Sequence, residues 1–363
     1  MKTLAAISRP GTPAPVIETF DIEDPRDDEI LVRIVASGIC HTDLMMHERA
    51  QHAPRPMILG HEGAGVIERV GPGVERLKPG DHVALSYSYC GHCPNCRKGE
   101  NSYCDEMGIR NFGGLRADGS SAVHQNGKPV AARFFNQSSF SQFAIANEGS
   151  AVLVPKDVPI ELLGPLGCGI LTGAGSVMNA LKVRPGDSIA VFGTGGVGLS
   201  AIMAARLSGA KHIIAIDKIP SRLALARELG ATAAVDVTSD GPVESIRALI
   251  ARGIEFALLT VPAKTAFAQA TRALAMHGTL GMVISPDGEI SLGGMLSGGQ
   301  RWVSILMGDA TPQLFIPMLI DLYRQGRFPF DKLVKFYAFE DIAQAFHDSE
   351  AGTTIKPILR MPH

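Results

Sequence analysis

The feature that most constrains the fold is an alternation of apolar strand-like segments with helical patterns, which begins at residue 188. The two kinds of segment differ in the spacing of their apolar residues. Strands that alternate with helices in this way form a parallel sheet with right-handed crossovers. The predicted strands are 188–192, 212–216, 234–237, 255–260 and 279–284, with a further strand expected at 303–306, and the predicted helices are 197–208, 221–229, about 243–251 and 266–275.

The part of the chain before residue 164 has a different character. It contains short strand-like runs between glycine and proline turn signals, for example 29–35 and 65–70. Many short strands with such turns predict a barrel-like or sandwich-like domain.

The C-terminal tail departs again from the alternating pattern. It reads as a helix at 312–325, a strand at 334–337, a short helix at 341–347 and a strand at 355–360. We expect this tail to pack back on the first domain. A chain of 363 residues favours two domains. The predicted division is therefore 1–163 with 312–363 for a discontinuous first domain, and 164–311 for the second.

A glycine-rich loop lies between the first strand and the first helix of the alternating region. Gly193, Gly195 and Gly198 fit the pattern G-x-G-x-x-G. The first glycine permits a tight turn, the second lets the backbone approach a diphosphate, and the third lets the helix pack on the strand. The diphosphate then lies at the helix N-terminus, where unpaired N–H groups favour an anion. We expect the loop, with Gly196 and Val197, to bind a dinucleotide; a purely structural glycine turn is the alternative.

Asp217 ends the next predicted strand, at the spacing that dinucleotide sites use for an acidic residue. Its carboxylate can accept hydrogen bonds from ribose hydroxyls and would repel a phosphate there, which favours NAD over NADP. Lys218 and Arg222 are close in sequence and can soften this discrimination. The alternative is a solvated acid at a strand end.

Four of the six cysteines form a compact C-x2-C-x2-C-x7-C run. The segment around it, about 88–107, has little apolar content, so a metal is needed to hold it folded. Four thiolates complete the coordination of a structural zinc and leave no position for chemistry. Surface thiols without metal are the alternative, and a nucleic-acid-binding finger is disfavoured because the flanks are neither basic nor rich in aromatics. The predicted ligands are Cys90, Cys93, Cys96 and Cys104.

The other two cysteines, Cys40 and Cys168, stand apart, with His61 between them in sequence. Two cysteines and one histidine are a ligand set that a catalytic zinc uses, with a fourth position open. Sequence spacing alone cannot bring three scattered residues together.

Composition narrows the functional class. The net charge of −2 gives no reason to expect nucleic acid or an anionic membrane as a partner. The N-terminus has no apolar run of the kind that a secretory signal needs. Thiolate metal ligands suit a reducing compartment, so we expect a cytoplasmic protein.

Taken together, the motifs resemble those of the zinc-dependent medium-chain alcohol dehydrogenases over nearly the full chain. The resemblance implies a Rossmann doubly wound domain that binds NAD, a chaperonin-like (GroES-like) β-barrel catalytic domain, two zinc ions per subunit and a homodimer or homotetramer. Segments 134–140, 161–166 and 328–337 are most similar to the aryl (benzyl-type) members. The family motifs, in chain order, are residues 40–43, 60–63, the four-cysteine run, 166–169 and 193–198.

By the same resemblance, Cys40, His61 and Cys168 hold the catalytic zinc, which acts as a Lewis acid on an alcohol oxygen while hydride passes to the nicotinamide. The resemblance assigns four further roles. Asp43 fixes the tautomer of the metal-bound imidazole, Thr42 takes the substrate proton, Glu62 approaches the metal as a transient ligand or only supports the site, and His41 contacts a cofactor phosphate.

Three positions depart from the family pattern. Met45 stands where many members end the proton relay with a histidine, so the last relay step needs water or another base. Segments 259–264 and 282–286 also differ where relatives hold the nicotinamide end. The leading expectation is oxidation of a primary, aromatic or allylic alcohol. The alternatives are a formaldehyde-type or polyol dehydrogenase and a catalytically silent nucleotide-binding relative; a zinc-free quinone reductase is disfavoured because the metal-ligand positions are filled.

Overall fold

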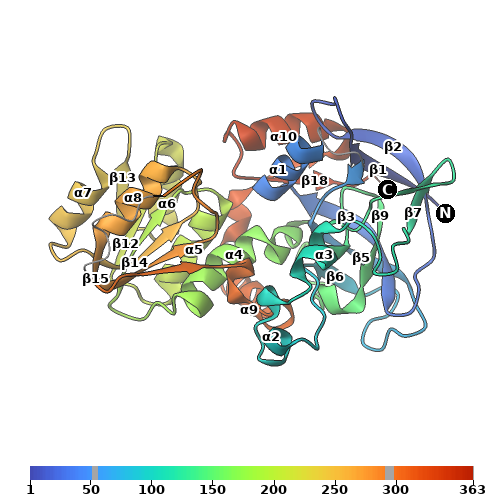
Figure 1. Ribbon diagram of the computed structural model, residues 1–363, viewed down its shortest axis with the longest axis horizontal. Coiled ribbons are helices and arrows are strands. Elements are labelled where there is room, and N and C mark those ends of the chain that lie inside the picture. The colour runs from blue at the N-terminus through green and yellow to red at the C-terminus, as the bar shows by residue number, and fades with distance from the viewer. Residues whose placement is uncertain (51–55, 291–297, 363) are drawn as a thin grey trace. The chain divides into compact units, whose positions relative to one another are not determined.

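The computed structural model describes residues 1–50, 56–290 and 298–362 (Figure 1). The chain divides into two compact units. The first contains Met1–Cys168, Thr311–Asp321 and Asp331–His363, and the second contains Gly169–Ala310 and Leu322–Phe330.

The first unit is built on two sheets. One has the strand order β4-β1-β2-β7-β8, and the other has the order β10-β6-β5-β3-β18-β17, with β9 paired to β3. Its strands are β1 Lys2–Ser8, β2 Val16–Ile22, β3 Glu29–Gly38, β4 Met57–Ile58, β5 Glu62–Val70, β6 His82–Leu85, β7 Val123–Gln125, β8 Lys128–Val130, β9 Phe143–Asn147, β10 Ala151–Leu153, β17 Val334–Ala338 and β18 Lys356–Arg360. Its helices are α1 His41–Ala50, α2 Pro94–Arg97, α3 Met107–Phe112 and α10 Ile342–Glu350.

Strand β3 organises this unit. It is buried along most of its length and pairs with β5, β9 and β18. A strand that is covered on both faces needs a nearly continuous apolar run, and 30–36 supplies one with a single arginine. The pairing of β18 with β3 shows that the chain returns to the first unit at its end, with Ile358 opposite Gly38.

The tail does not return as one piece. Helix α9, Pro312–Arg324, contributes its residues up to Asp321 to the first unit, and the segment Leu322–Phe330 clusters with the second. The expectation of an uninterrupted 312–363 segment in the first domain therefore differs from the division seen here.

The second unit contains a six-stranded parallel sheet with the order β13-β12-β11-β14-β15-β16. The order reverses beside β11, which is the arrangement of a doubly wound fold. Helix α5 contacts α6, and α7 contacts α8. The strands are β11 Ser188–Phe192, β12 His212–Asp217, β13 Ala233–Asp236, β14 Ile254–Leu259, β15 Leu274–Met282 and β16 Arg301–Ser304, and the helices are α4 Gly169–Gly175, α5 Gly196–Leu207, α6 Pro220–Leu229, α7 Pro242–Leu249 and α8 Lys264–Ala273.

The predicted strand–helix alternation is confirmed, including the sixth strand. Most boundaries differ by one or two residues, and β15 begins at Leu274, whereas the predicted strand began at 279. The predicted helix 266–275 ends at Ala273, because Leu274 adopts extended backbone angles and pairs with Ile254 as the first residue of β15. The sheet core is apolar throughout, with Ala190, Ile214 and Leu280 fully buried. In the described parts of the chain, the helices are too short or too polar to cross a lipid bilayer.

Candidate metal and cofactor sites

The three scattered candidates of the first unit meet in the structure. The ligand atoms of Cys40, His61, Glu62 and Cys168 all lie within 4.8 Å of one another. Strand pairing explains the first part of this convergence, because Gly38 at the end of β3 lies opposite Glu62 at the start of β5. Cys40 and His61 therefore emerge side by side from two paired strands.

The third cysteine reaches the cluster through a glycine-rich turn. Residues Gly164–Gly167 form a short 3-10 turn whose backbone lies against two strands. A Cβ on Gly164 would lie 2.1 Å from the carbonyl oxygen of Glu62, and one on Gly167 would lie 1.9 Å from that of Leu85. Only glycine allows so close an approach. The Ser86 hydroxyl donates a 2.6 Å hydrogen bond to the Gly167 carbonyl and fixes the turn just before Cys168.

His61 is fully buried and held in one orientation. Its Nδ1 lies 2.9 Å from Asp43 Oδ1, and its ring stacks on Phe135 at 4.5 Å. Asp43 also accepts hydrogen bonds from the backbone N–H groups of Cys40 and Gly60. The remaining ring atom, Nε2, is buried and has no hydrogen-bond partner among the described residues. A buried nitrogen without a partner is costly unless a ligand satisfies it.

The ionisable groups of the cluster shift one another's pKa values. Cys168 hydrogen-bonds to Cys40, which is the main reason that the pKa of Cys40 lies well below its usual value while that of Cys168 lies well above. Burial lowers the pKa of His61, but the charge of Asp43 and its hydrogen bond overcome this and raise it to about 10. A zinc ion fits this ligand set. It consists of two thiols and an imidazole whose Nδ1 is bonded to a carboxylate and whose Nε2 has no hydrogen-bond partner among the described residues.

The four cysteines of the compact run also converge, with their sulfur atoms within 4.8 Å of one another. Backbone N–H groups point at the sulfurs: Cys90 N lies 3.2 Å from Cys104 Sγ, and Cys93 N lies 3.2 Å from Cys90 Sγ. Such donors stabilise thiolates. Beyond the cysteines, this lobe's apolar cluster adds only the partly buried Tyr89 and Met107, which agrees with a fold that depends on a metal.

The glycine loop has the geometry expected of a dinucleotide site. Gly193 has φ of +98°, and a Cβ on Gly198 would lie 1.9 Å from the Gly193 carbonyl oxygen. Helix α5 begins at Gly196, directly after the turn. Two of the three glycines are therefore required by backbone geometry, and Val197 is the second residue of helix α5.

Asp217 ends β12 and is bonded to the loop. Its Oδ2 accepts hydrogen bonds from Thr194 N at 2.6 Å and Thr194 Oγ1 at 2.7 Å, and its Oδ1 accepts from the backbone N–H groups of Lys218 and Ile219. The carboxylate thus fixes the loop that it adjoins. Arg222 lies on α6, and the Lys218 side chain is exposed.

Three further positions lie on α1, immediately after Cys40. His41 is exposed, Thr42 Oγ1 lies 3.9 Å from Cys40 Sγ, and Met45 is partly buried. The nearest histidine on this helix, His47, is buried against Phe346 and hydrogen-bonds to Ser8, so it does not take the place of a relay histidine at Met45.

Sequence reasoning missed two groups beside the cluster. Lys356, on the last strand, pairs with Glu62, and Phe134 and Phe135 pack on the His61 ring. A single lysine in the last strand has no sequence motif around it that would mark it as part of a site. The aromatic pair stands in a segment that contributed only to the family resemblance.

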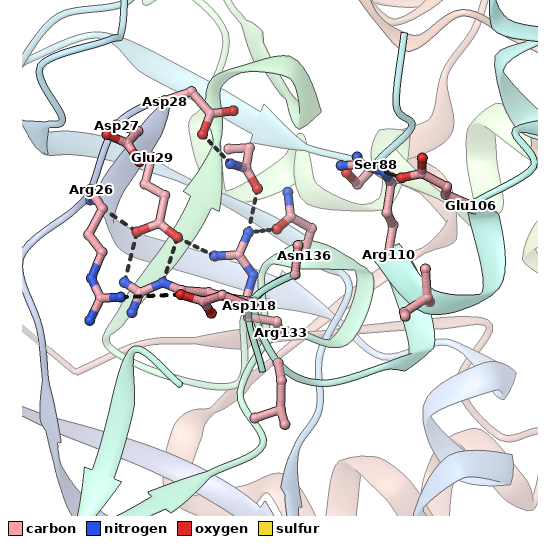
Figure 2. Close-up of a pocket in the computed structure, with 15 residues that line it drawn as sticks. Arg26, Asp27, Asp28, Glu29, Ser88, Glu106, Arg110, Asp118, Arg133 and Asn136 are labelled. Atoms are coloured by element: carbon pink, nitrogen blue, oxygen red, sulfur yellow. Dashed lines mark hydrogen bonds and ion pairs between the residues drawn. The ribbon is translucent and has the colours of Figure 1, made fainter. Parts of the chain in front are cut away.

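A separate cleft of about 620 Å³ in the first unit is lined mainly by charged side chains (Figure 2). The buried Glu29 carboxylate at its wall accepts hydrogen bonds from Arg116 and Arg133, and Arg133 also contacts Asn136 and Asn147. These charges satisfy one another, and the cleft shares no residue with the Cys40–His61–Glu62–Cys168 cluster or with the four-cysteine cluster. We therefore assign it a structural role.

Comparisons with known proteins agree with this geometry. Residues 26–156 match the family described as alcohol dehydrogenase GroES-like domain, and residues 196–322 match the zinc-binding dehydrogenase family. Geraniol dehydrogenase from Castellaniella defragrans is 45% identical over 98% of this chain and 96% of its own length.

Two solved structures cover 100% of both chains. An alcohol dehydrogenase zinc-binding domain protein from Burkholderia ambifaria is 50% identical with a TM-score of 0.96, and benzyl alcohol dehydrogenase from Acinetobacter calcoaceticus is 43% identical with a TM-score of 0.94. The chain belongs to the zinc-dependent medium-chain alcohol dehydrogenase family. The predicted fold class, a GroES-like domain joined to a Rossmann domain, is confirmed.

Proposed function

We propose that this enzyme oxidises primary aromatic or allylic alcohols to aldehydes with NAD, at a zinc ion held by Cys40, His61 and Cys168. The observation that carries the proposal is the convergence of these three side chains, with His61 Nε2 left without a hydrogen-bond partner in the part of the chain that the structure describes. When bound, the zinc ion supplies Lewis acidity that lowers the pKa of an alcohol hydroxyl.

The chain's own residues then have defined tasks. Asp43 holds the proton of His61 at Nδ1, so that Nε2 faces the metal as a neutral donor. Thr42, whose hydroxyl lies beside Cys40 Sγ, accepts the proton that leaves the alcohol. With Met45 in place of a histidine, that proton continues to solvent through water.

The preference for aromatic or allylic alcohols rests on an aromatic cluster beside His61. Phe134 meets the His61 ring edge-on at 5.2 Å, Phe135 stacks on it, and Phe112 packs on both phenylalanines while remaining 40% exposed. Flat, polarisable substrates gain from edge-to-face contact with such rings. The printed names of two relatives, geraniol dehydrogenase and benzyl alcohol dehydrogenase, agree with this class.

NAD is the proposed cofactor. The Gly193–Gly198 loop receives the diphosphate, and Asp217 disfavours a phosphate on the adenosine ribose. His41, exposed at the first position of α1, is proposed to contact a cofactor phosphate. Lys218 and Arg222 are proposed to lie near the ribose.

A second zinc ion in the four-cysteine lobe is proposed to be structural, which gives two zinc ions per chain. The free thiols of both clusters favour a reducing compartment, and we propose a cytoplasmic homodimer or homotetramer.

A substrate screen tests the proposal. Purified enzyme is assayed for formation of NADH from NAD, or of NADPH from NADP, with benzyl alcohol, cinnamyl alcohol, geraniol, ethanol, a polyol and formaldehyde with glutathione. We expect kcat/KM to be highest for the aromatic or allylic alcohols with NAD. Preference for the polyol or for formaldehyde with glutathione would support the alternative dehydrogenases, and no turnover of any substrate by zinc-loaded protein would support a silent relative.

A further inference from the structure

The buried carboxylate next to the proposed zinc ligands pairs with a buried lysine. Both oxygens of Glu62 lie 2.9 Å from Lys356 Nζ, and Nζ also donates to the Ile39 carbonyl at 3.2 Å. Glu62 is fully buried and Lys356 is 4% exposed. The two residues are 294 positions apart in sequence, so the pair forms only when β18 joins the sheet beside β3.

The backbone around Glu62 is shaped to its carboxylate. A Cβ on Gly38 would lie 2.2 Å from Glu62 Oε2, and one on Gly164 would meet the Glu62 carbonyl. The carboxylate therefore occupies a space that any other residue at position 38 would fill. The close packing of Gly38 and Gly164 keeps Glu62 beside the cluster, and the pair with Lys356 orients its carboxylate oxygens toward Nζ.

Charge balance indicates why the lysine is needed. Two thiolates, one neutral imidazole and a divalent cation sum to zero, and the buried Glu62 carboxylate would leave the cluster with one excess negative charge. Lys356 supplies the positive charge that balances the Glu62 carboxylate. Burying an unpaired charge costs several kcal/mol, of order 3–5 when one partner of a buried pair is removed.

Glu62 has a second way to be neutralised. One of its carboxylate oxygens lies within 4.8 Å of the ligand atoms of Cys40, His61 and Cys168, so it is a candidate fourth donor to the same cation. Zinc in a catalytic site keeps one position open, and a fourth protein ligand would close it. The lysine and the cation therefore compete for one carboxylate.

We propose that Lys356 is a positioning residue that keeps Glu62 off the catalytic metal, and so holds open the fourth coordination position and sets how readily this metal is released. The proposal rests on the proposed metal site. A purely structural ion pair would also explain the contacts. In that case, replacing Lys356 would change the stability of the fold, but it would not change metal exchange in a way that depends on Glu62.

The test measures zinc release to a chromogenic chelator, together with the visible spectrum of the cobalt-substituted enzyme. The release phase that disappears in Cys168→Ala is assigned to this site, and the phase from the four-cysteine lobe serves as an internal reference. The variants are Lys356→Met, Lys356→Arg, Glu62→Gln and the double variant Lys356→Met/Glu62→Gln, which removes both buried charges. Lys335→Met is the matched control. Lys335 lies exposed on β17, the strand adjacent to β18, and pairs with Asp348 of α10.

We expect Lys356→Met to slow release from this site by about tenfold, in line with the effect of groups that orient metal ligands, and to shift the cobalt spectrum toward four protein ligands. Lys356→Arg and Lys335→Met should behave as wild type. In the Glu62→Gln background, removing Lys356 should change neither readout. Equal release rates and spectra in Lys356→Met and wild type would overturn the inference. A change in release rate or spectrum on replacing Lys356 that also occurs in the Glu62→Gln background would overturn it as well. If wild type shows no phase that depends on Cys168, the metal assignment itself is wrong.

Discussion

Asp43 Oδ1 lies 2.9 Å from His61 Nδ1 in a fully buried pair, which leaves the opposite ring nitrogen facing Cys40 and Cys168. Replacing Asp43 with Asn keeps the shape but can present an N–H to Nδ1 and favour the wrong tautomer. We expect Asp43→Asn to weaken zinc binding at this site by about 10–100-fold. Competition with a chelator of known affinity measures it, and unchanged affinity in a folded Asp43→Asn protein would show that the pair does not orient the ligand.

Thr42 tests the first proton-transfer step. Thr42→Ser keeps the hydroxyl and should retain most activity, whereas Thr42→Val removes the proton acceptor and should lower kcat by about 100-fold or more. Zinc content should stay the same in both. Steady-state kinetics with benzyl alcohol compare them, and similar kcat values for the two variants would remove Thr42 from the mechanism.

Asp217 tests cofactor selection. Its carboxylate fixes Thr194 and is proposed to accept the ribose hydroxyls. Losing hydrogen bonds to a charged acceptor costs about 1.5–3 kcal/mol each, so Asp217→Ala should raise the KM for NAD at least about tenfold and reduce the preference for NAD over NADP. Thr194→Val, which loses only the hydroxyl contact, should have a milder effect. An unchanged NAD/NADP ratio in Asp217→Ala would assign the residue to loop structure alone.

Glu29 gives a pH-dependent stability prediction. Burial raises the pKa of Glu29, but hydrogen bonds from Arg116 and the backbone and the charge of Arg133 outweigh it, so the pKa lies below its ordinary 4.5. The stabilisation is therefore complete above pH 4.5 and is lost as the pH falls through the lower folded value.

The Glu29→Gln variant isolates this contribution. At neutral pH the free energy of unfolding should be on the order of 3 kcal/mol lower than that of wild type, because the variant leaves the buried Arg133 without its carboxylate and removes one of the two carboxylates that pair with Arg116. Urea unfolding at several pH values measures the difference, which should shrink below pH 4.5. A difference that grows toward acid would contradict the sign.

The four-cysteine lobe should behave differently from the Cys40 cluster. Cys96→Ala removes a thiolate from a segment with little apolar support, so we expect a lower melting temperature or altered assembly. Any remaining folded enzyme should keep its turnover per zinc at the other site. Loss of activity with unchanged melting and oligomeric state would argue against a structural role.

The Rossmann unit was predictable because its signals are local. The strand at 188–192 matches β11 to the residue, since four apolar residues and Ser188, all buried, lie between a turn and a glycine loop. Helix α1 was not predicted, because its mixed polar sequence shows no apolar stripe.

The candidate residues of the site could be named from the sequence, but the geometry that brings them together could not. Motif contexts identified Cys40, His61 and Cys168, but their meeting depends on the β3–β5 register and on the Gly164–Gly167 turn. Neither is encoded by spacing along the chain. The Lys356–Glu62 pair joins β18 to β5, and no local sequence pattern predicts it.

The most direct test of the metal assignment is anomalous diffraction from crystals of the enzyme at the zinc absorption edge. We predict two peaks per chain, one among Cys40, His61 and Cys168 and one among the four cysteines of the lobe. A refined map with no peak among Cys40, His61 and Cys168 in active enzyme would contradict it.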